Sequence, residues 1–182
     1  MDNNIRKSIE NLSTNLIDIH FIIVGNGNNI KAQYPSLKSS ILKLSDLAES
    51  TSNINEELDA LIEKHEKIFL ILIDKENSLK KLLDILENIS SDNSAKDLID
   101  AKTQLKLVRE EISLFSKEYN RITKILKESY ESIKNKQGIN PSNHKKTVEI
   151  LEQDYNKSAK KLTLSAANAH EYISRFLRNA KN

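Results

Sequence analysis

The chain contains no cysteine. This absence excludes disulfide bonds, thiolate metal sites and cysteine nucleophiles together, so a secreted fold held by disulfides is ruled out. Glycine and proline are scarce, with 3 and 2 residues among 182, and tryptophan is absent. All-β and α/β folds need more turn-forming residues than this. We therefore predict an all-α protein.

Long hydrophobic runs are missing as well. The longest, Ile68 to Ile73, is about a third of the ~20 residues that a membrane-spanning helix needs. The segment Met1 to Glu10 lacks the basic stretch and apolar core of a signal peptide, and no cysteine is present to carry a lipid. We expect no transmembrane helix and a cytoplasmic location.

What the chain does have is an apolar residue at every third or fourth position, in two long series that each keep one phase. Sustained spacing of this kind predicts long amphipathic helices that lie side by side. The first series is Ile54, Leu58, Leu61, His65, Ile68, Leu72, Lys75, Leu79, Leu82, Leu86 and Ile89. The second is Leu98, Ala101, Leu105, Val108, Ile112, Phe115, Tyr119, Ile122, Leu126, Ser129 and Ile133.

Breaks in these patterns divide the chain into helices. Gly25 to Asn29 should end a first helix, because glycine and asparagine tolerate left-handed backbone angles. Pro35 closes that loop and Ser36 is a plausible start for the next helix, while Pro141 suits the first position of the last helix. The predicted helices span about 4–24, 36–50, 53–90, 95–136 and 141–180.

The segment between the second and third helices is ambiguous. Glu49 to Asn53 is poor helix interior, and Asn53 followed by Glu56 matches a capping box, which favours a break. However, Leu37, Leu44 and Leu47 share the phase of the series that begins at Ile54. We expect two helices in register or gently kinked, with one continuous helix over 36–90 as the alternative.

The expected architecture is a single domain, 1–182, that forms an elongated antiparallel helical bundle or coiled coil. It contains three long helices plus one or two shorter N-terminal helices, and short polar connectors favour antiparallel neighbours. The apolar stripes are widened by flanking residues, for example Leu107, Leu114 and Ile125. Such wide faces suit a bundle core better than a two-stranded coiled coil.

No pattern typical of catalysis, cofactor binding or metal binding occurs. Gly25-Asn26-Gly27 has no third glycine and no following Lys-Ser/Thr, so it does not match a nucleotide-binding loop. The histidines lie on different segments, and none has a glutamate three residues before it, as di-iron bundles require. They are His20, His65, His144 and His170. We predict no catalytic residue, no cofactor and no metal site.

His65 and Lys75 are polar residues at stripe positions of an otherwise aliphatic helix. The simpler interpretation is that His65 finds a hydrogen-bond partner at the edge of the core, and that Lys75 extends its ammonium to water. In the sharper interpretation both are specificity devices, because a polar seam residue fixes register or partner choice at some cost in stability.

The end of the last helix is the preferred candidate for a partner-binding surface. Aromatic and aliphatic side chains near a terminus, framed by arginine, are typical of interface anchors. The candidate residues are Leu162, Tyr172, Ile173, Arg175, Phe176 and Leu177. The same helix is mildly basic, with eight Lys/Arg against four Asp/Glu over 141–182. A solvated face explains that charge more often than nucleic acid or an anionic membrane does.

Two segments resemble FlgN-type flagellar export chaperones. Leu58 to Leu86, with Leu-Ile-Glu-Lys-His-Glu-Lys-Ile-Phe and Asp-Lys-Glu-Asn-Ser-Leu-Lys-Lys-Leu-Leu-Asp-Ile-Leu, is similar to the long first helix of that family. Leu164 to Ile173 is similar to the amphipathic helix near the family's end. The resemblance implies an all-helical cytoplasmic chaperone for hook-associated proteins, with a substrate groove around Leu162, Tyr172 and Phe176.

The expected function is therefore binding of a helical protein partner without enzymatic activity or a small-molecule substrate, with the export chaperone as the named special case. Two alternatives stay open. One is a structural coiled-coil subunit that assembles with itself or with related chains. The other is binding of nucleic acid or an anionic membrane through the basic C-terminal helix.

Overall fold

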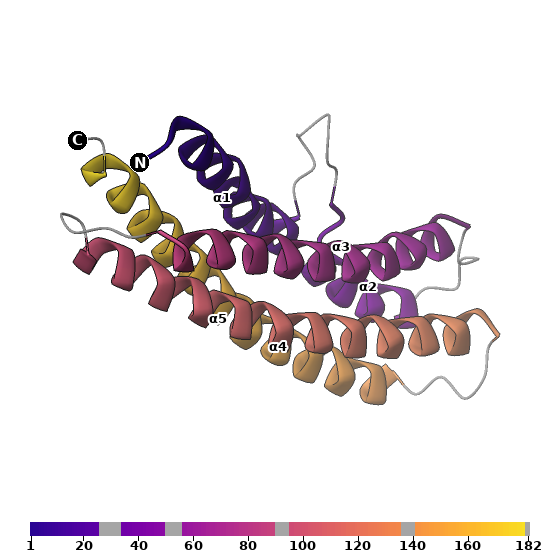
Figure 1. Cartoon of the computed structure of the whole chain (residues 1–182). Helices are drawn as coiled ribbons and strands as arrows, with labels where there is room; N and C mark the ends of the chain where they lie inside the picture. The colour runs from indigo at the N-terminus through magenta and orange to yellow at the C-terminus, as the bar shows by residue number, and fades with distance from the viewer. Residues whose placement is uncertain (26–33, 50–55, 90–94, 136–140, 181–182) are drawn as a thin grey trace.

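The computed structural model describes residues 1–25, 34–49, 56–89, 95–135 and 141–180. These residues form the helices α1 (Asn3–Val24), α2 (Leu37–Glu49), α3 (Glu56–Glu87), α4 (Ala95–Lys134) and α5 (Pro141–Asn179), as Figure 1 shows. No strand occurs within the described ranges. The predicted all-α helical bundle is thus confirmed, and the helices begin and end within a few residues of the predicted positions.

Local side chains explain several helix ends. The Asp2 carboxylate accepts a hydrogen bond from the Asn4 amide at 2.6 Å, which caps α1. Gly25 ends α1 at a φ of +68°, a left-handed angle that glycine adopts without strain. The Ser36 hydroxyl accepts from the Ser39 amide at 3.2 Å and caps α2 as expected. The predicted loop residues 26–29, the Asn53 cap and residues 137–140 lie outside the described ranges.

The three long helices pack side by side in alternating directions. Two ion pairs join α3 to α4. Lys134 pairs with Asp59 near the start of α3, and Lys106 pairs with Glu87 at the end of α3. On the other side of α4, Arg121 pairs with Asp154 of α5. Further along the same pair, the side-chain amide of Asn179 in α5 donates to Asp97 of α4. In each helix pair the partner number falls as the α4 number rises, so α4 runs antiparallel to both neighbours (Figure 1).

The two short N-terminal helices share the remaining place in the bundle. α1 packs against α3 and α5, whereas α2 packs against α5 and α4. Moving from α1 into α2, contacts with α5 pass from Leu177 to Tyr155 and then to Glu152. The helices therefore follow α5 in one direction and act together as an interrupted fourth helix of the bundle.

The chain reverses direction between α2 and α3. The Ser40 hydroxyl of α2 lies 2.9 Å from Nε2 of His65 in α3. One continuous helix would separate these residues by about 37 Å, at 1.5 Å per residue. Both the continuous helix over 36–90 and the gently kinked pair in register are therefore wrong. The shared apolar phase identifies the buried face of each helix but does not record that the two helices run in opposite directions.

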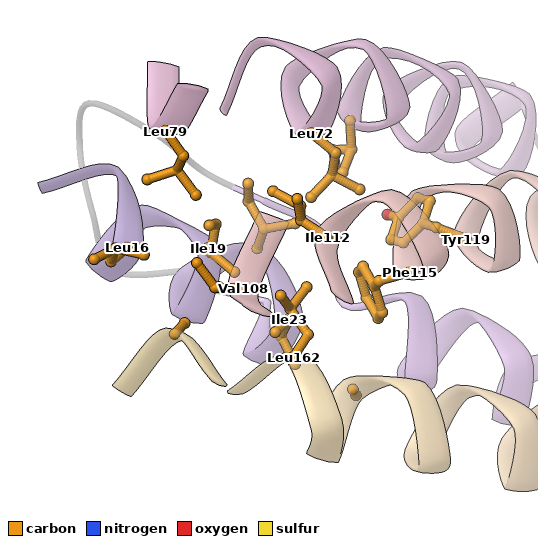
Figure 2. Packing of buried hydrophobic residues seen from close by; sticks show 14 of the residues in the cluster. Leu16, Ile19, Ile23, Leu72, Leu79, Val108, Ile112, Phe115, Tyr119 and Leu162 are labelled. Carbon is orange, nitrogen blue, oxygen red and sulfur yellow. The ribbon is translucent and has the colours of Figure 1, made fainter. Parts of the chain in front are cut away.

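The core runs through the centre of the bundle and takes residues from all five helices. Figure 2 shows part of it, where side chains of α1, α3, α4 and α5 converge: Leu16, Ile19, Ile23, Leu72, Leu79, Val108, Ile112, Phe115, Tyr119 and Leu162. These apolar contacts are the main stabilising term of a bundle of this kind. None of the helices in the described ranges combines the length and hydropathy that crossing a bilayer requires.

Candidate helix-docking surface

His65 lies at the centre of a buried polar cluster that joins three helices. Its side chain is 0% exposed. Nε2 lies 2.9 Å from the Ser40 hydroxyl of α2, and Nδ1 lies 2.6 Å from the Tyr119 hydroxyl of α4. Burial lowers the pKa of His65 to about 4, because desolvation disfavours the imidazolium. The ring is therefore neutral at physiological pH.

One arrangement of protons satisfies every donor in this cluster. Tyr119 donates to Nδ1 of His65, Nε2–H of His65 donates to Ser40, and Ser40 donates to the Ser36 carbonyl 3.2 Å away. In the other neutral tautomer Nδ1–H would donate to Tyr119 and leave the phenol proton without an acceptor in the cluster. The hydrogen-bond pattern thus assigns the proton to Nε2.

Two further tyrosines attach the N-terminal helices to the long ones. The Tyr130 hydroxyl of α4 donates to the Ser40 carbonyl, and the Tyr155 hydroxyl of α5 donates to the Ile23 carbonyl, each at 2.5 Å. Ile23 lies in the last turn of α1, where carbonyls lack helical partners. Burial raises the pKa of Tyr130 to about 12 and also raises the pKa of Tyr155. Both phenols therefore remain donors.

Lys75 bonds to α1 and is partly buried against it. Its Nζ atom lies 2.5 Å from an Asp18 carboxylate oxygen and 3.0 Å from the Asn15 side-chain oxygen. The side chain is only 17% exposed. The interpretation in which Lys75 only extends its ammonium to water omits these bonds to α1. Both predicted specificity residues bond to other helices, His65 to α2 and α4 and Lys75 to α1, while their role in register or partner choice stays a prediction.

The predicted partner-binding residues of α5 do not form an exposed surface. Four of them belong to the core: Leu162, Ile173, Phe176 and Leu177. The Arg6 guanidinium of α1 donates to the Leu177 carbonyl, so the first helix covers this end of α5. Tyr172 and Arg175 remain partly exposed, with the guanidinium carbon 5.0 Å from the ring centroid. The aromatic and aliphatic residues near the end of α5 therefore indicate core packing, because α1 packs over this end of the helix.

An exposed groove instead follows the outer side of the α4–α5 pair. We call it the outer groove, with a volume of about 360 Å³; it is lined by Glu111, Leu114, Phe115, Glu118, Arg121, Asp154, Lys157, Ser158 and Lys161. Phe115 is buried at its floor. Leu114 is 56% exposed at its edge, although the sequence pattern suggested that it widens the buried seam. That expectation is wrong for Leu114 and for Leu107, which is 46% exposed.

Large apolar residues recur at heptad spacing on both rims of the outer groove. On α4, Leu107 lies seven residues before Leu114. On α5, Ile150 and Leu164 lie seven residues on either side of Lys157, which lines the groove. Residues seven apart share one ridge of a helix, so these side chains continue the two rims. All four are exposed hydrophobics. The sequence signal was present, because Leu107 and Leu114 lie out of phase with the buried stripe of α4.

The two walls of the outer groove differ in charge. The α4 wall carries Glu111 and Glu118, and the α5 wall carries Lys157 and Lys161. Arg121 bridges the walls at one end by pairing with Glu118 and with Asp154. Hydrogen bonding to Glu118 is the largest cause of the raised pKa of Arg121. Among the residues that the structure describes, Glu111, Lys157 and Lys161 make no ion pair with one another or with other side chains.

The described ranges contain no group of three or more His, Cys, Asp or Glu residues that could hold a metal ion. Burial lowers the pKa of His65, and its side chain is enclosed by hydrogen-bond partners. A fully buried imidazole has no route to a substrate, so its shifted pKa reflects the packing of three helices. Perturbed pKa values mark structural networks as well as active sites.

These features define an all-α helical bundle with a buried polar cluster and an exposed groove. Comparison with known protein families, with curated proteins and with solved structures finds no significant match to the chain.

Proposed function

We propose that this chain is a non-enzymatic helical-bundle protein that binds another helical protein in the outer groove. The named special case is a cytoplasmic export chaperone for flagellar hook-associated proteins. Its support is the resemblance of Leu58 to Leu86 and of Leu164 to Ile173 to FlgN-type chaperones. The family's groove would involve Leu162 and Phe176, which are buried here, so the proposal moves the binding surface to the neighbouring groove beside Leu164.

The observation that carries the proposal is the pair of exposed apolar rims. Leu107, Leu114, Ile150 and Leu164 are between 46% and 61% exposed. Exposed large apolar residues beside a groove with charged walls are typical of protein-binding sites. Residues at heptad spacing on two antiparallel helices form the kind of groove in which an amphipathic helix lays its apolar face.

A structural subunit of a larger assembly is the second candidate function. The opposite charges of the two walls favour it, because a surface that carries both signs can pair with a copy of itself. The basic C-terminal helix does not add support for nucleic-acid binding at this groove, since the facing wall of α4 is acidic.

The experiment is affinity capture of the tagged full-length protein from its own cells, with mass spectrometry of what remains bound. Leu114→Glu places a charge on the rim of the outer groove and should lose the partner. The matched control is Leu70→Glu on α3, because Leu70 is 62% exposed and does not line the outer groove. This control should retain the partner.

Recovery of hook-associated or other exported filament proteins that depends on Leu114 would support the chaperone. Recovery of only the protein itself or of other coiled-coil proteins would favour the structural subunit. If both variants retain the same partner as the unmodified protein, the outer groove is not the binding surface.

A further inference from the structure

The walls of the outer groove are arranged at matching levels along the bundle. The bond between Arg121 and Asp154 fixes the register of the antiparallel helices α4 and α5. Moving three residues along each helix places Glu118 level with Lys157. Four residues further along each helix, Leu114 lies level with Lys161. After three more residues, Glu111 lies level with Leu164. The acidic groups on one wall therefore lie within one turn of the basic groups on the other.

This arrangement is self-complementary about a two-fold axis that runs along the groove. Such an axis would place α4 of one copy over α5 of a second copy. Each residue would keep its position along the direction of the helices. Glu118 of each copy would then face Lys157 of the other, and Glu111 would lie one turn from the opposing Lys161. An isologous interface needs this property, since the same patch must serve both subunits.

We infer that the outer groove is covered by a second copy of this chain when no other partner is bound, which gives a symmetric homodimer. The inference rests on the proposed function, because it takes the outer groove as the docking surface. It adds that a second copy covers this surface when no other partner is bound, which we call the resting state. Association removes the exposed apolar rims from water, and the charges of the two walls set the orientation of the second copy. A different helical protein must displace the second copy in order to bind.

The charges favour a second copy over an occupant with a single sign of charge. A uniformly acidic helix would oppose the α4 wall, and a uniformly basic one would oppose the α5 wall. Glu111, Lys157 and Lys161 have no ion-pair partner within the described part of the chain. A two-fold related copy supplies a partner to both walls at once.

Sedimentation equilibrium of the full-length chain tests the inference through two charge-reversal variants. In Glu111→Lys/Glu118→Lys both walls are basic, and in Lys157→Glu/Lys161→Glu both walls are acidic. Circular dichroism should confirm that each variant remains helical, because Lys157 and Lys161 are exposed and Glu111 and Glu118 are partly exposed, so none of the four belongs to the buried core. The unmodified protein should have twice the 20.8 kDa mass of one chain.

Each variant alone should dissociate, with a dimer dissociation constant at least about tenfold higher, because like charges then face one another. An equimolar mixture of the two folded variants should recover a dimer that contains one copy of each. An unmodified protein that stays monomeric at micromolar concentration overturns the inference. So does a dimer that both variants retain, or a mixture that fails to associate.

The two proposals fail in different ways. If the protein does not dimerise but captures a partner in a way that depends on Leu114, the inferred homodimer is wrong and the proposed function stands. A charge-dependent dimer from which no cellular partner is captured would remove binding of another helical protein but leave the self-association.

Discussion

Nδ1 of His65 on α3 lies 2.6 Å from the hydroxyl oxygen of Tyr119 on α4, and the two aromatic rings meet edge to face. The other ring nitrogen of His65 bonds to Ser40 on α2. This one imidazole therefore links α2 to two long helices through buried hydrogen bonds. Buried polar groups of this kind specify a single arrangement of helices when all their bonds are satisfied.

Replacing Tyr119 by phenylalanine should destabilise the fold by about 1–3 kcal/mol, because Nδ1 of His65 would be buried without a partner. Urea unfolding followed by circular dichroism measures the change. Tyr172→Phe is the matched control, since Tyr172 is partly exposed and its hydroxyl makes no hydrogen bond to the described residues. The control should change stability by less than about 0.5 kcal/mol. Equal effects of the two substitutions would contradict the assigned bond.

The stability of the protein should fall between pH 6.5 and pH 4 because of His65. Burial lowers its pKa in the folded state to about 4, whereas the unfolded chain has the ordinary value of 6.5. In this interval the unfolded state binds the proton and the folded state does not, so protonation favours unfolding. Above pH 6.5 the contribution is fully present, and by pH 4 about 3 kcal/mol of it should be lost.

Urea midpoints measured across this pH range, for the unmodified protein and for His65→Gln, isolate that contribution. Carboxylate titration affects both proteins alike, while only the unmodified protein has the imidazole. The variant should therefore show a shallower loss of stability on acidification. Superimposable pH profiles would show that His65 does not titrate as described.

Gly25→Ala should destabilise the junction between α1 and α2. A Cβ atom at this position would lie 2.6 Å from the Cα atom of Ser36, and the φ of +68° is unfavourable for alanine. The left-handed angle alone costs about 1–2 kcal/mol, and the backbone contact adds to it. Thermal unfolding should show a lower midpoint with unchanged helicity at low temperature. A variant as stable as the unmodified protein would mean that Gly25 is not held beside Ser36.

Lys75 and Asp18 should be energetically coupled across the α1–α3 contact. A double-mutant cycle with Lys75→Met and Asp18→Asn should give a coupling energy of about 0.5–1 kcal/mol, a modest value because Asp18 is 40% exposed. The coupling should shrink when the salt concentration is raised. A coupling of zero would show that the pair does not contribute to the placement of α1.

The sequence predicts the helices well because their apolar residues repeat at the helical period. Ile112 and Leu105 lie in the middle of the second series and are fully buried. The same periodicity does not identify which helix covers a stripe. Leu37 and Leu44 share a phase with the third helix, yet their helix runs the other way. The contact of Ser40 with His65 depends on that reversal and has no signature in local spacing.

The candidate site was harder to predict for the same reason. Phe176 and Leu177 have the composition of interface anchors, but α1 and α4 bury them. Leu114 has the composition of a core residue, but it lies just outside the buried stripe and is exposed. A shift of about one residue around a helix separates core from surface, and single-sequence patterns do not resolve it for wide apolar faces.

The central claim is that a helical partner binds in the outer groove, and affinity measurements on matched leucine variants test it most directly. Isothermal titration calorimetry of the captured partner should show binding to the unmodified protein and to Leu70→Glu with similar affinity. Leu114→Glu should weaken binding by at least about tenfold, because the substitution buries a charge against an apolar helix face. Equal affinities of the two variants, each folded and helical, would contradict the account.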